Sequence, residues 1–583
     1  MVNAALQPSL KHTLVSKVVY FPTTKSKQLL YTSVLEMSSS TLEDDIEQSE
    51  TLIRHGIVKL KDLYQTEFRL DAEFNIETKF GDNSLQNLEN NGLENKSLCG
   101  ENSFCKEAFY SSRLKRVYVK KYEYGVPFLS SSDIISFRPE TNRYLSRKNT
   151  SDLEKLLIQK WDVLLSRSGT AGNVGLVAEN FAGKALSEDI IRIRFNDADT
   201  AGYITAFLRC RYGRPQLIQS IYGSVVNQIE LTHLERVLIP DLSPIRQIAI
   251  GRLMCQAGEL RDEANQILDE ADRLLHERLN LPYLKDIAPR GRASAIAKVK
   301  ASQLMGRLEG SFHDPVAIAA EKQLAELSVE ITTVGDSRVI KEIRAITKFR
   351  KRTYVEKGGI PLLSSKQLFQ IDPVDVKKLA KGAHTKDLPE IQLEENMIAV
   401  TRSGTIGRVQ IIPKYMAEWT ASEDATRILA SDNVNSGYLY AWLTSDYGHC
   451  LITRQSYGSV IVHIDSDMLA SIAIPLPEAS IRNEIGNLVL KANQLRDQAW
   501  CNEQEAITKL ENWIANKPIA SAQDESNPNK IDLTKIKYDP DAIPIWELVA
   551  QISAKVPDEE WKKLPTDLAR RFDDYQKQRQ GQD

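Results

Sequence analysis

The chain contains an internal duplication, and this feature constrains its fold more than any other. The segment that begins at Trp161, WDVLLSRSGTAGNVGLV, matches the segment that begins at Asn396, NMIAVTRSGTIGRVQII. A second matched pair begins at Ser220 and at Gln455 and carries the letters YGS in both copies. Each second copy lies 235 positions after the first. Because the matched segments keep their order and spacing, we predict two units with the same fold.

Each unit has the pattern of a β-rich domain. Short runs of β-branched and aromatic residues are bounded by Gly, Pro and Ser, which is typical of strands and turns. Helices are expected within the units at 202–212 and 437–447. After each unit the pattern changes to one long helix, from about Pro244 to Asn280 and from about Ser480 to Ala515. The sequence therefore predicts an α+β protein in the order globule, helix, globule, helix.

Both long helices carry an apolar seam with alternating spacings of four and three residues, which is typical of a coiled coil. The seam of the first helix consists of Leu253, Ala257, Leu260, Ala264, Ile267, Ala271 and Leu274. The seam of the second consists of Ile481, Ile485, Leu488, Ala492, Leu495 and Ala499. Because a whole globule separates the helices in the chain, we expect them to pair as an antiparallel coiled coil. The alternative is that each helix packs on its own globule.

The pattern divides the chain into six segments. An N-terminal extension covers residues 1–59, and a linker with a C-terminal helical tail covers 516–583. Between them lie the first globule, 60–243, the first spacer helix, 244–282, the second globule, 283–479, and the second spacer helix, 480–515.

Composition excludes several classes of protein. The formal net charge of −3 gives no overall attraction to nucleic acid, so any such surface has to be local. The six cysteines form no CxxC pair and have no histidine cluster beside them, which argues against a zinc site and a disulfide framework. No apolar run is long enough to span a membrane, and the N-terminus lacks the apolar core of a signal peptide. We therefore expect a cytoplasmic protein.

Three motifs recur in both copies and are candidates for contact with DNA. The KRxYV segments are basic and can supply phosphate contacts, although a solvated edge strand would look the same. The SRSG and TRSG turns could hold a phosphate, but a hairpin turn needs the same glycines. The YGS segments carry the same two interpretations, of which the structural one is favoured. The candidate DNA-binding residues are Lys115, Arg116, Tyr118, Arg167, Ser168, Tyr222, Ser224, Lys351, Arg352, Tyr354, Arg402, Ser403, Tyr457 and Ser459.

An acidic pair also recurs, as Glu188-Asp189 and Glu423-Asp424. These carboxylates could bind a metal ion in a nuclease, but neither pair lies near a lysine in a D…(D/E)xK arrangement. Such a pair can equally orient an arginine or accept from a cytosine amino group. The chain has no (D/N)PP(Y/F) methyltransferase motif, no GxGxxG loop and no Walker motif. We therefore expect neither a catalytic residue nor a metal site.

Together these motifs resemble the specificity subunits of type I restriction-modification systems over roughly residues 60–515. The resemblance rests on the SRSGTAG and TRSGTIG turns, the YGS segments followed by Pro240 and Pro475, and the helix starts IRQIAIGRL and IRNEIGNLV. It implies that the globules are two target recognition domains, each reading one half of a split site in double-stranded DNA. The paired helices would be a spacer of fixed length, and the chain would not be an enzyme.

The resemblance implies partners as well. Methylation subunits, expected in two copies, would transfer the methyl group, and restriction subunits would translocate and cut the DNA. S-adenosylmethionine, ATP and magnesium are expected in those partners, and no cofactor is expected in this chain. Two alternatives from other classes stay open. One is an autonomous metal-dependent enzyme that acts on DNA, and the other is a coiled-coil scaffold protein.

Overall fold

The computed structural model describes residues 93–515, with gaps at 121, 140, 169–170, 220–227, 289–298, 302–303, 305, 346–351, 356–357, 404 and 459–461. It also describes the backbone of β1 (Val15–Val19), which pairs antiparallel with β2 (His55–Lys59) in the N-terminal extension. The chain divides into two compact units, residues 1–517 and 518–583. The second unit, which contains most of the expected C-terminal tail, lies outside the described residues.

The first globule is built on three small sheets. Their strand orders are β4-β11-β8-β9, β10-β6-β7-β5 and β12-β3, and only the pairing of β10 with β6 is parallel. The central strands β8 and β11 have the sequences VLLS and IIRIR and are buried along nearly their whole length, Arg192 included. The elements are β3 (Asn95–Ser97), β4 (Glu107–Phe109), β5 (Tyr118–Val119), β6 (Gly125–Leu129), β7 (Tyr144–Ser146), β8 (Val163–Ser166), β9 (Val174–Leu176), β10 (Ala185–Leu186), β11 (Ile190–Arg194), α5 (Ala198–Arg209), α6 (Gly213–Gln219), α7 (Leu231–Leu234) and β12 (Leu238–Pro240).

The second globule repeats this topology. Its strand orders are β14-β21-β18-β19, β20-β16-β17-β15 and β22-β13, and β20 pairs with β16 in parallel. This confirms the predicted α+β fold with two similar β-rich globules. The elements are α9 (Leu284–Ile287), α10 (Pro315–Ala325), β13 (Glu330–Thr333), β14 (Ile340–Arg344), β15 (Tyr354–Val355), β16 (Ile360–Leu363), β17 (Lys377–Leu379), α11 (Leu388–Ile391), β18 (Ile398–Thr401), β19 (Val409–Ile411), β20 (Thr420–Ala421), β21 (Ala425–Ala430), α12 (Asn433–Thr444), α13 (Asp446–Gln455), α14 (Ser466–Ala470) and β22 (Ala473–Leu476).

The helices α5 and α12 begin four residues before the positions expected from sequence, at Ala198 and Asn433. Each starts directly after an aspartate whose side chain caps the helix. Asp197 accepts from the amide of Thr200 at 2.8 Å, and Asp432 accepts from the amide of Asn435 at 2.7 Å. These caps satisfy amides that the first turn leaves without a partner, and they explain the earlier start.

Each globule is joined to a long helix, α8 (Pro244–Arg278) or α15 (Ala479–Ile514), by a contact between two glycines. A Cβ atom at Gly202 of α5 would lie 2.4 Å from the carbonyl oxygen of Gly251 in α8. In the second copy, a Cβ atom at Gly437 of α12 would lie 2.3 Å from the carbonyl oxygen of Gly486 in α15. Only glycine permits backbones to approach this closely. Each long helix is therefore fixed to its own globule near its N-terminal end.

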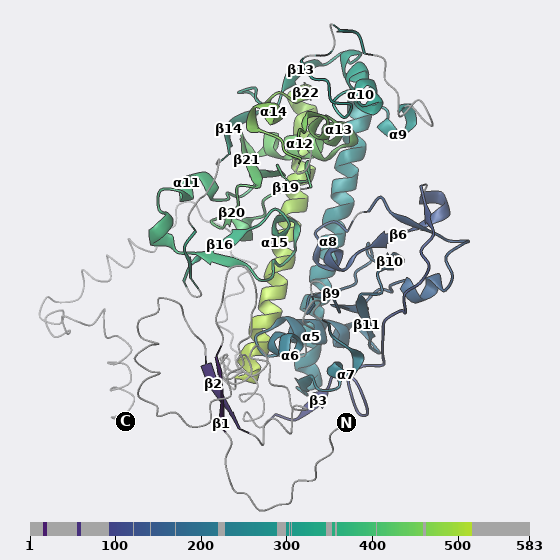
Figure 1. The fold of residues 1–583 in the computed structure, drawn as a ribbon, viewed down its shortest axis with the longest axis vertical. Coiled ribbons are helices and arrows are strands. Elements are labelled where there is room, and N and C mark those ends of the chain that lie inside the picture. The colour runs from purple at the N-terminus through teal and green to yellow at the C-terminus, as the bar shows by residue number, and fades with distance from the viewer. Residues whose placement is uncertain are drawn as a thin grey trace, which may run out of the picture. The chain divides into compact units, whose positions relative to one another are not determined.

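The two long helices also lie side by side and antiparallel (Figure 1). Arg278 near the end of α8 binds Glu484 near the start of α15, whereas Arg261 in the middle of α8 binds Glu503 farther along α15. The predicted antiparallel pairing and its alternative, packing of each helix on its own globule, therefore both occur. The regular heptad geometry of a coiled coil stays a prediction.

The far end of each long helix completes the core of the other globule. Ala506, Leu510 and Ile514 of α15 are buried in the same cluster as the strands β8 and β11 of the first globule. Ala271 and Leu275 of α8 and Leu279 directly after it, which lie 235 positions earlier, are buried in the core of the second globule. The C-terminal end of each long helix thus packs into the globule of the other half of the chain. Each long helix therefore contributes to the cores of both globules.

Candidate nucleic-acid interface

The KRxYV segments lead into the edge strands β5 and β15, where the exposed rings of Tyr118 and Tyr354 occupy equivalent places. Lys115 is exposed, whereas Arg116 is half-buried and donates to Glu188 at 2.5 Å. In the second copy Arg352 makes the same contact with Glu423. The recurring acidic residue therefore orients an arginine, which is one of the two roles that the sequence left open.

The side chains around these ion pairs hold them in place. The guanidinium of Arg116 lies 4.8 Å from the ring centre of Phe128, and the ring of Tyr118 meets the same phenylalanine edge to face. Burial lowers the pKa of Arg116, but the contacts with Glu188 and Tyr118 raise it above its usual value. The guanidinium of Arg116 therefore stays charged at neutral pH and is held in one orientation.

The SRSG and TRSG turns are hairpins. The first connects β8 to β9 and the second connects β18 to β19, and both strand pairs are antiparallel. Gly172 and Gly407 have φ values of 88° and 79°, in the region that favours glycine. A hairpin therefore accounts for Gly172 and Gly407, whereas Gly169 and Gly404 lie outside the described residues. A role of the turns in binding phosphate stays a prediction.

The arginine of each turn is bound to an acid that follows the YGS segment. Arg167 pairs with Glu230, and Arg402 lies 3.3 Å from Asp465, which is the equivalent residue. A tyrosine hydroxyl donates to each acid: that of Tyr110 to Glu230 at 2.8 Å, and that of Tyr457 to Asp465 at 2.9 Å. These hydrogen bonds raise the pKa of both tyrosines, so the phenols stay neutral.

The structure brings the recurring motifs together. The residue after each turn arginine, Ser168 or Ser403, forms a β-bridge to the segment that follows YGS, at Gln228 or His463. The backbone amide of Arg402 donates to the carbonyl oxygen of Asp424 at 2.9 Å, and the first copy has the same bond. The hydroxyl of Ser403 donates to the Asp424 carboxylate at 2.5 Å. Thus the turn arginine and serine, the residues that follow the YGS segment, the acidic pair and the KRxYV arginine lie next to one another in each globule.

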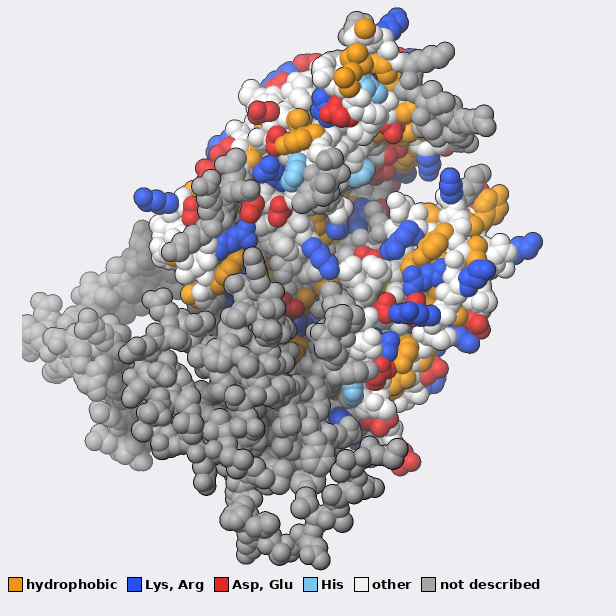
Figure 2. Space-filling view, viewed as in Figure 1, with side chains coloured by type: hydrophobic (Ala, Val, Ile, Leu, Met, Phe, Trp, Pro, Cys, Tyr) orange, Lys and Arg blue, Asp and Glu red, His pale blue; other side chains and the backbone are white. Residues whose placement is uncertain are grey.

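Sequence reasoning missed a second basic segment in each copy. Strand β7 lies between β6 and the edge strand β5, and it brings the exposed Arg143, Arg147 and Lys148 beside the KRVYV segment. Strand β17 likewise brings Lys377, Lys378 and the following Lys381 beside Tyr354. Lys and Arg side chains gather over the part of the first globule that carries β6 and β10 (Figure 2). Both segments are basic in sequence, RYLSRK at 143–148 and KKLAKG at 377–382. They resemble each other too weakly to be recognised as equivalent without the strand pairing.

Four candidate residues, Tyr222, Ser224, Lys351 and Ser459, lie outside the described residues. Where the chain is described, it holds no group of three or more His, Cys, Asp or Glu side chains arranged to bind a metal ion. None of its described helices combines the length and the apolar character that crossing a bilayer requires.

Residues 334–489 match the family model described as the type I restriction modification DNA specificity domain. This range begins after β13 and ends within α15, so it covers most of the second globule and the start of its helix. The equivalent elements of the first globule have the same strand order and the same motifs. No curated protein matches the chain.

Solved structures similar to this chain come from the same kind of system. One is the S subunit of a type I restriction-modification system from M. genitalium, with 12% identity, a TM-score of 0.28, and coverage of 72% of this chain and 98% of that chain. Another is the HsdS subunit from Thermoanaerobacter tengcongensis, with 14% identity, a TM-score of 0.22, and coverage of 72% and 98%. TM-scores this low carry no argument about this chain.

Proposed function

We propose that the chain is a specificity subunit of the type I restriction-modification family and that each of its globules reads one half of a split site in double-stranded DNA. Such subunits address a DNA sequence and leave the chemistry to other chains. The two globules, within the predicted limits 60–243 and 283–479, would be the two target recognition domains.

The observation that carries this proposal is the occurrence of two equivalent surfaces at opposite ends of one helix pair. The globules are fixed to α8 near Gly251 and to α15 near Gly486, which are the N-terminal ends of antiparallel helices. Helix α8 has 35 residues and is about 52 Å long at 1.5 Å per residue. That length corresponds to about 15 base pairs of DNA, more than one turn of the duplex.

Residues that are the same in both globules are suited to the phosphate backbone, which is the same at both half-sites. Motifs that are the same in both globules cannot distinguish two different half-sites, so we assign them to the phosphate backbone. The exposed Lys115, with Arg143 and Lys377 on the neighbouring strands, would neutralise phosphates and position each globule. The ion-paired Arg116 and Arg352 would present an oriented N–H group beside them. Base reading would then fall to residues that differ between the copies.

Partner subunits would act at the site that this chain selects. We propose two methylation subunits and further restriction subunits, which would use S-adenosylmethionine, ATP and magnesium. The complex would work in the cytoplasm, where the host DNA lies.

Selection from random DNA tests this function. Full-length protein, alone and with its methylation subunits, is incubated with a library in which two random blocks are separated by random spacers. We expect enrichment of two unlike half-sites at one fixed separation. Enrichment of one continuous site, or of none, would contradict the proposal. Magnesium-dependent cutting by the pure chain that Glu423→Ala abolishes would favour the nuclease alternative instead.

A further inference from the structure

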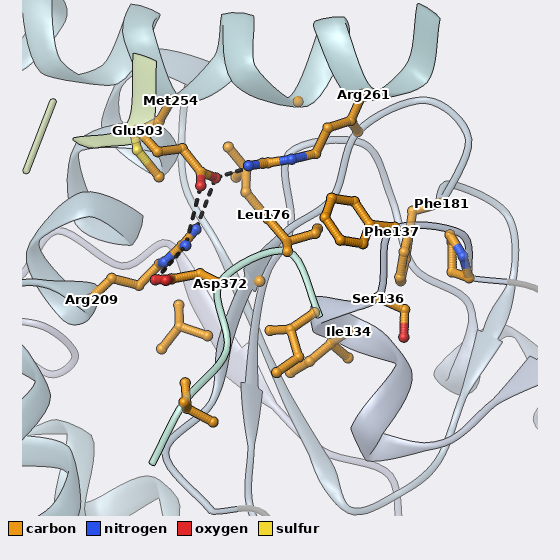
Figure 3. Close-up of a pocket in the computed structure, with 18 of the residues that line it drawn as sticks. Ile134, Ser136, Phe137, Leu176, Phe181, Arg209, Met254, Arg261, Asp372 and Glu503 are labelled. Atoms are coloured by element: carbon orange, nitrogen blue, oxygen red, sulfur yellow. Dashed lines mark hydrogen bonds and ion pairs between the residues drawn. The ribbon is translucent and has the colours of Figure 1, made fainter. Parts of the chain in front are cut away.

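Glu503 of α15 lies where both globules and both long helices meet (Figure 3). Its carboxylate is buried and accepts from Nη1 of Arg209 at 2.8 Å and from Nη1 of Arg261 at 2.6 Å. Arg209 ends α5 of the first globule, and Arg261 lies in the middle of α8. Nη2 of Arg209 also donates to Asp372, in the loop before β17 of the second globule, at 3.0 Å. We call these four residues the Glu503 cluster.

The carboxylate of Glu503 is ionised at neutral pH. Burial by itself raises the pKa of Glu503, but Arg209 and Arg261 outweigh it and lower the pKa to about 2. The side chains of both arginines are close to nine-tenths buried. Buried, charged hydrogen bonds are short and directional, and removal of one partner leaves an unpaired charge in the interior.

Apolar packing leaves a cavity at this junction, although Phe137 of the first globule is buried in a core cluster of the second. A cavity of about 250 Å³ lies beside the cluster, lined by Ile134, Phe137, Leu176 and Met254 among others. Other direct links between the globules include backbone bonds from Phe137 to the carbonyl oxygen of Phe369 at 3.1 Å and from Ile371 to that of Ile135 at 2.7 Å. They also include the ion pair of Arg214 with Asp375 at 3.3 Å. Protein cores are otherwise close-packed, so the polar contacts beside this cavity contribute to the geometry of the junction.

The Glu503 cluster is present on only one side of the helix pair, although the two halves of the chain are related by the duplication. On the opposite side of the helix pair, Leu268 and Thr444 occupy the places equivalent to Glu503 and Arg209. Arg496, the equivalent of Arg261, instead packs its buried guanidinium over the ring of Phe137, with 4.8 Å between them. A helix pair of this design therefore folds without an acid at this place on one of its two sides.

We propose that Glu503 is a positioning residue, which fixes the first globule relative to the second and thereby sets the separation of the two DNA half-sites. This inference rests on the proposed function. A change of one base pair in the spacer displaces a half-site by about 3.4 Å along the duplex. Hydrogen bonds of 2.6 to 3.0 Å, such as those of the cluster, do not survive such a shift.

The library with random spacers tests this role with two variants of the full-length chain. Glu503→Gln keeps the shape and removes the charge. Asp372→Asn removes the charge of the partner in the second globule, and it leaves no buried charge unpaired because Arg209 still binds Glu503. For both we expect the same half-sites as wild type but several neighbouring spacer lengths. The enrichment of the best spacer over the next should fall about tenfold, the effect of one lost charged hydrogen bond.

Glu505→Gln is the matched control, because Glu505 is exposed on the same helix and binds only Lys509 among the described contacts. It should select the wild-type spacer. If Asp372→Asn and Glu503→Gln stay folded and keep one sharp spacer, the positioning role is wrong while the proposed function stands. If the wild type selects no split site, the proposed function is wrong. The positioning role of Glu503 is then still tested by spin labels at the exposed positions 148 and 386, one in each globule. Their distance distribution should broaden in Glu503→Gln but not in Glu505→Gln.

Discussion

At the scale of single residues, the arginines of the recurring motifs are bound to acids. Arg116 and Arg167 each face a carboxylate in the first globule, and Arg352 and Arg402 do so in the second. Acids at these positions reduce the positive potential that a phosphate would meet. They also keep each guanidinium in one orientation, which favours a directional contact over general attraction.

Removal of one such acid should strengthen binding to DNA of any sequence. In Glu423→Gln the charge of Arg352 is no longer balanced, so it can neutralise one more phosphate. The plot of log affinity against log salt concentration should become steeper by about one unit. Titrations of a fixed duplex at several salt concentrations measure this slope, with Glu390→Gln, at an exposed acid of the same globule, as the control. A changed base preference with an unchanged slope would show that Glu423 reads a base instead.

The low pKa of Glu503 predicts a pH dependence of stability. Its pKa is about 2 in the folded chain and about 4.3 when unfolded, so it stabilises the fold above pH 4.3 and loses this effect as the pH falls towards 2. Near neutral pH, Glu503→Gln should lower the free energy of unfolding by about 3 kcal/mol. The difference from wild type should shrink between pH 4.3 and 2. Urea denaturation at several pH values measures this, and Glu505→Gln should show no such trend.

At the scale of elements, each long helix serves two globules at once. Helix α8 meets the first globule at Gly251 and the second at Ala271, while α15 meets the second at Gly486 and the first at Ala506. A change in the length of one helix therefore conflicts with the unchanged length of the other.

Insertions should consequently be tolerated only in matched pairs. Four residues after Glu263 add about 6 Å and roughly one helical turn, and the equivalent place in α15 follows Gln498. Both insertions together should preserve folding and lengthen the preferred DNA spacer by about one or two base pairs. Either insertion alone should lower the melting temperature sharply, because one globule then loses its helix contacts. A single insertion that folds normally and shifts the spacer would contradict this coupling.

At the scale of the whole molecule, the first globule should depend on the C-terminal end of α15. A chain that stops after Trp500 lacks Ala506, Leu510 and Ile514, which are buried in the first core. Burial of one large apolar side chain contributes about 2 kcal/mol, so the loss should unfold or loosen the first globule. Limited proteolysis should then cleave residues 93–243, and a chain that stops after Lys517 should resist. Equal resistance of both chains would show that the first globule folds without α15.

The sequence by itself determined the duplication, the α+β order and the long helices, because each of these is a local pattern or a comparison of the chain with itself. It also identified the motif residues that lie on one surface, including Arg167, Ser168 and their counterparts Arg402 and Ser403. The family resemblance that these motifs carry agrees with the match of residues 334–489.

Only the tertiary structure decided which groups meet. The partner of Arg116 lies 72 positions away, and Arg209 and Glu503 are separated by 294 positions, so no local pattern connects them. The basic strands β7 and β17 became part of the candidate interface through pairing with β5 and β15. The burial of each helix end in the core of the other globule likewise depends on the antiparallel packing of α8 against α15. In each case long-range packing selects one contact among many that the same residues allow, and periodicity along the chain carries no information about that choice.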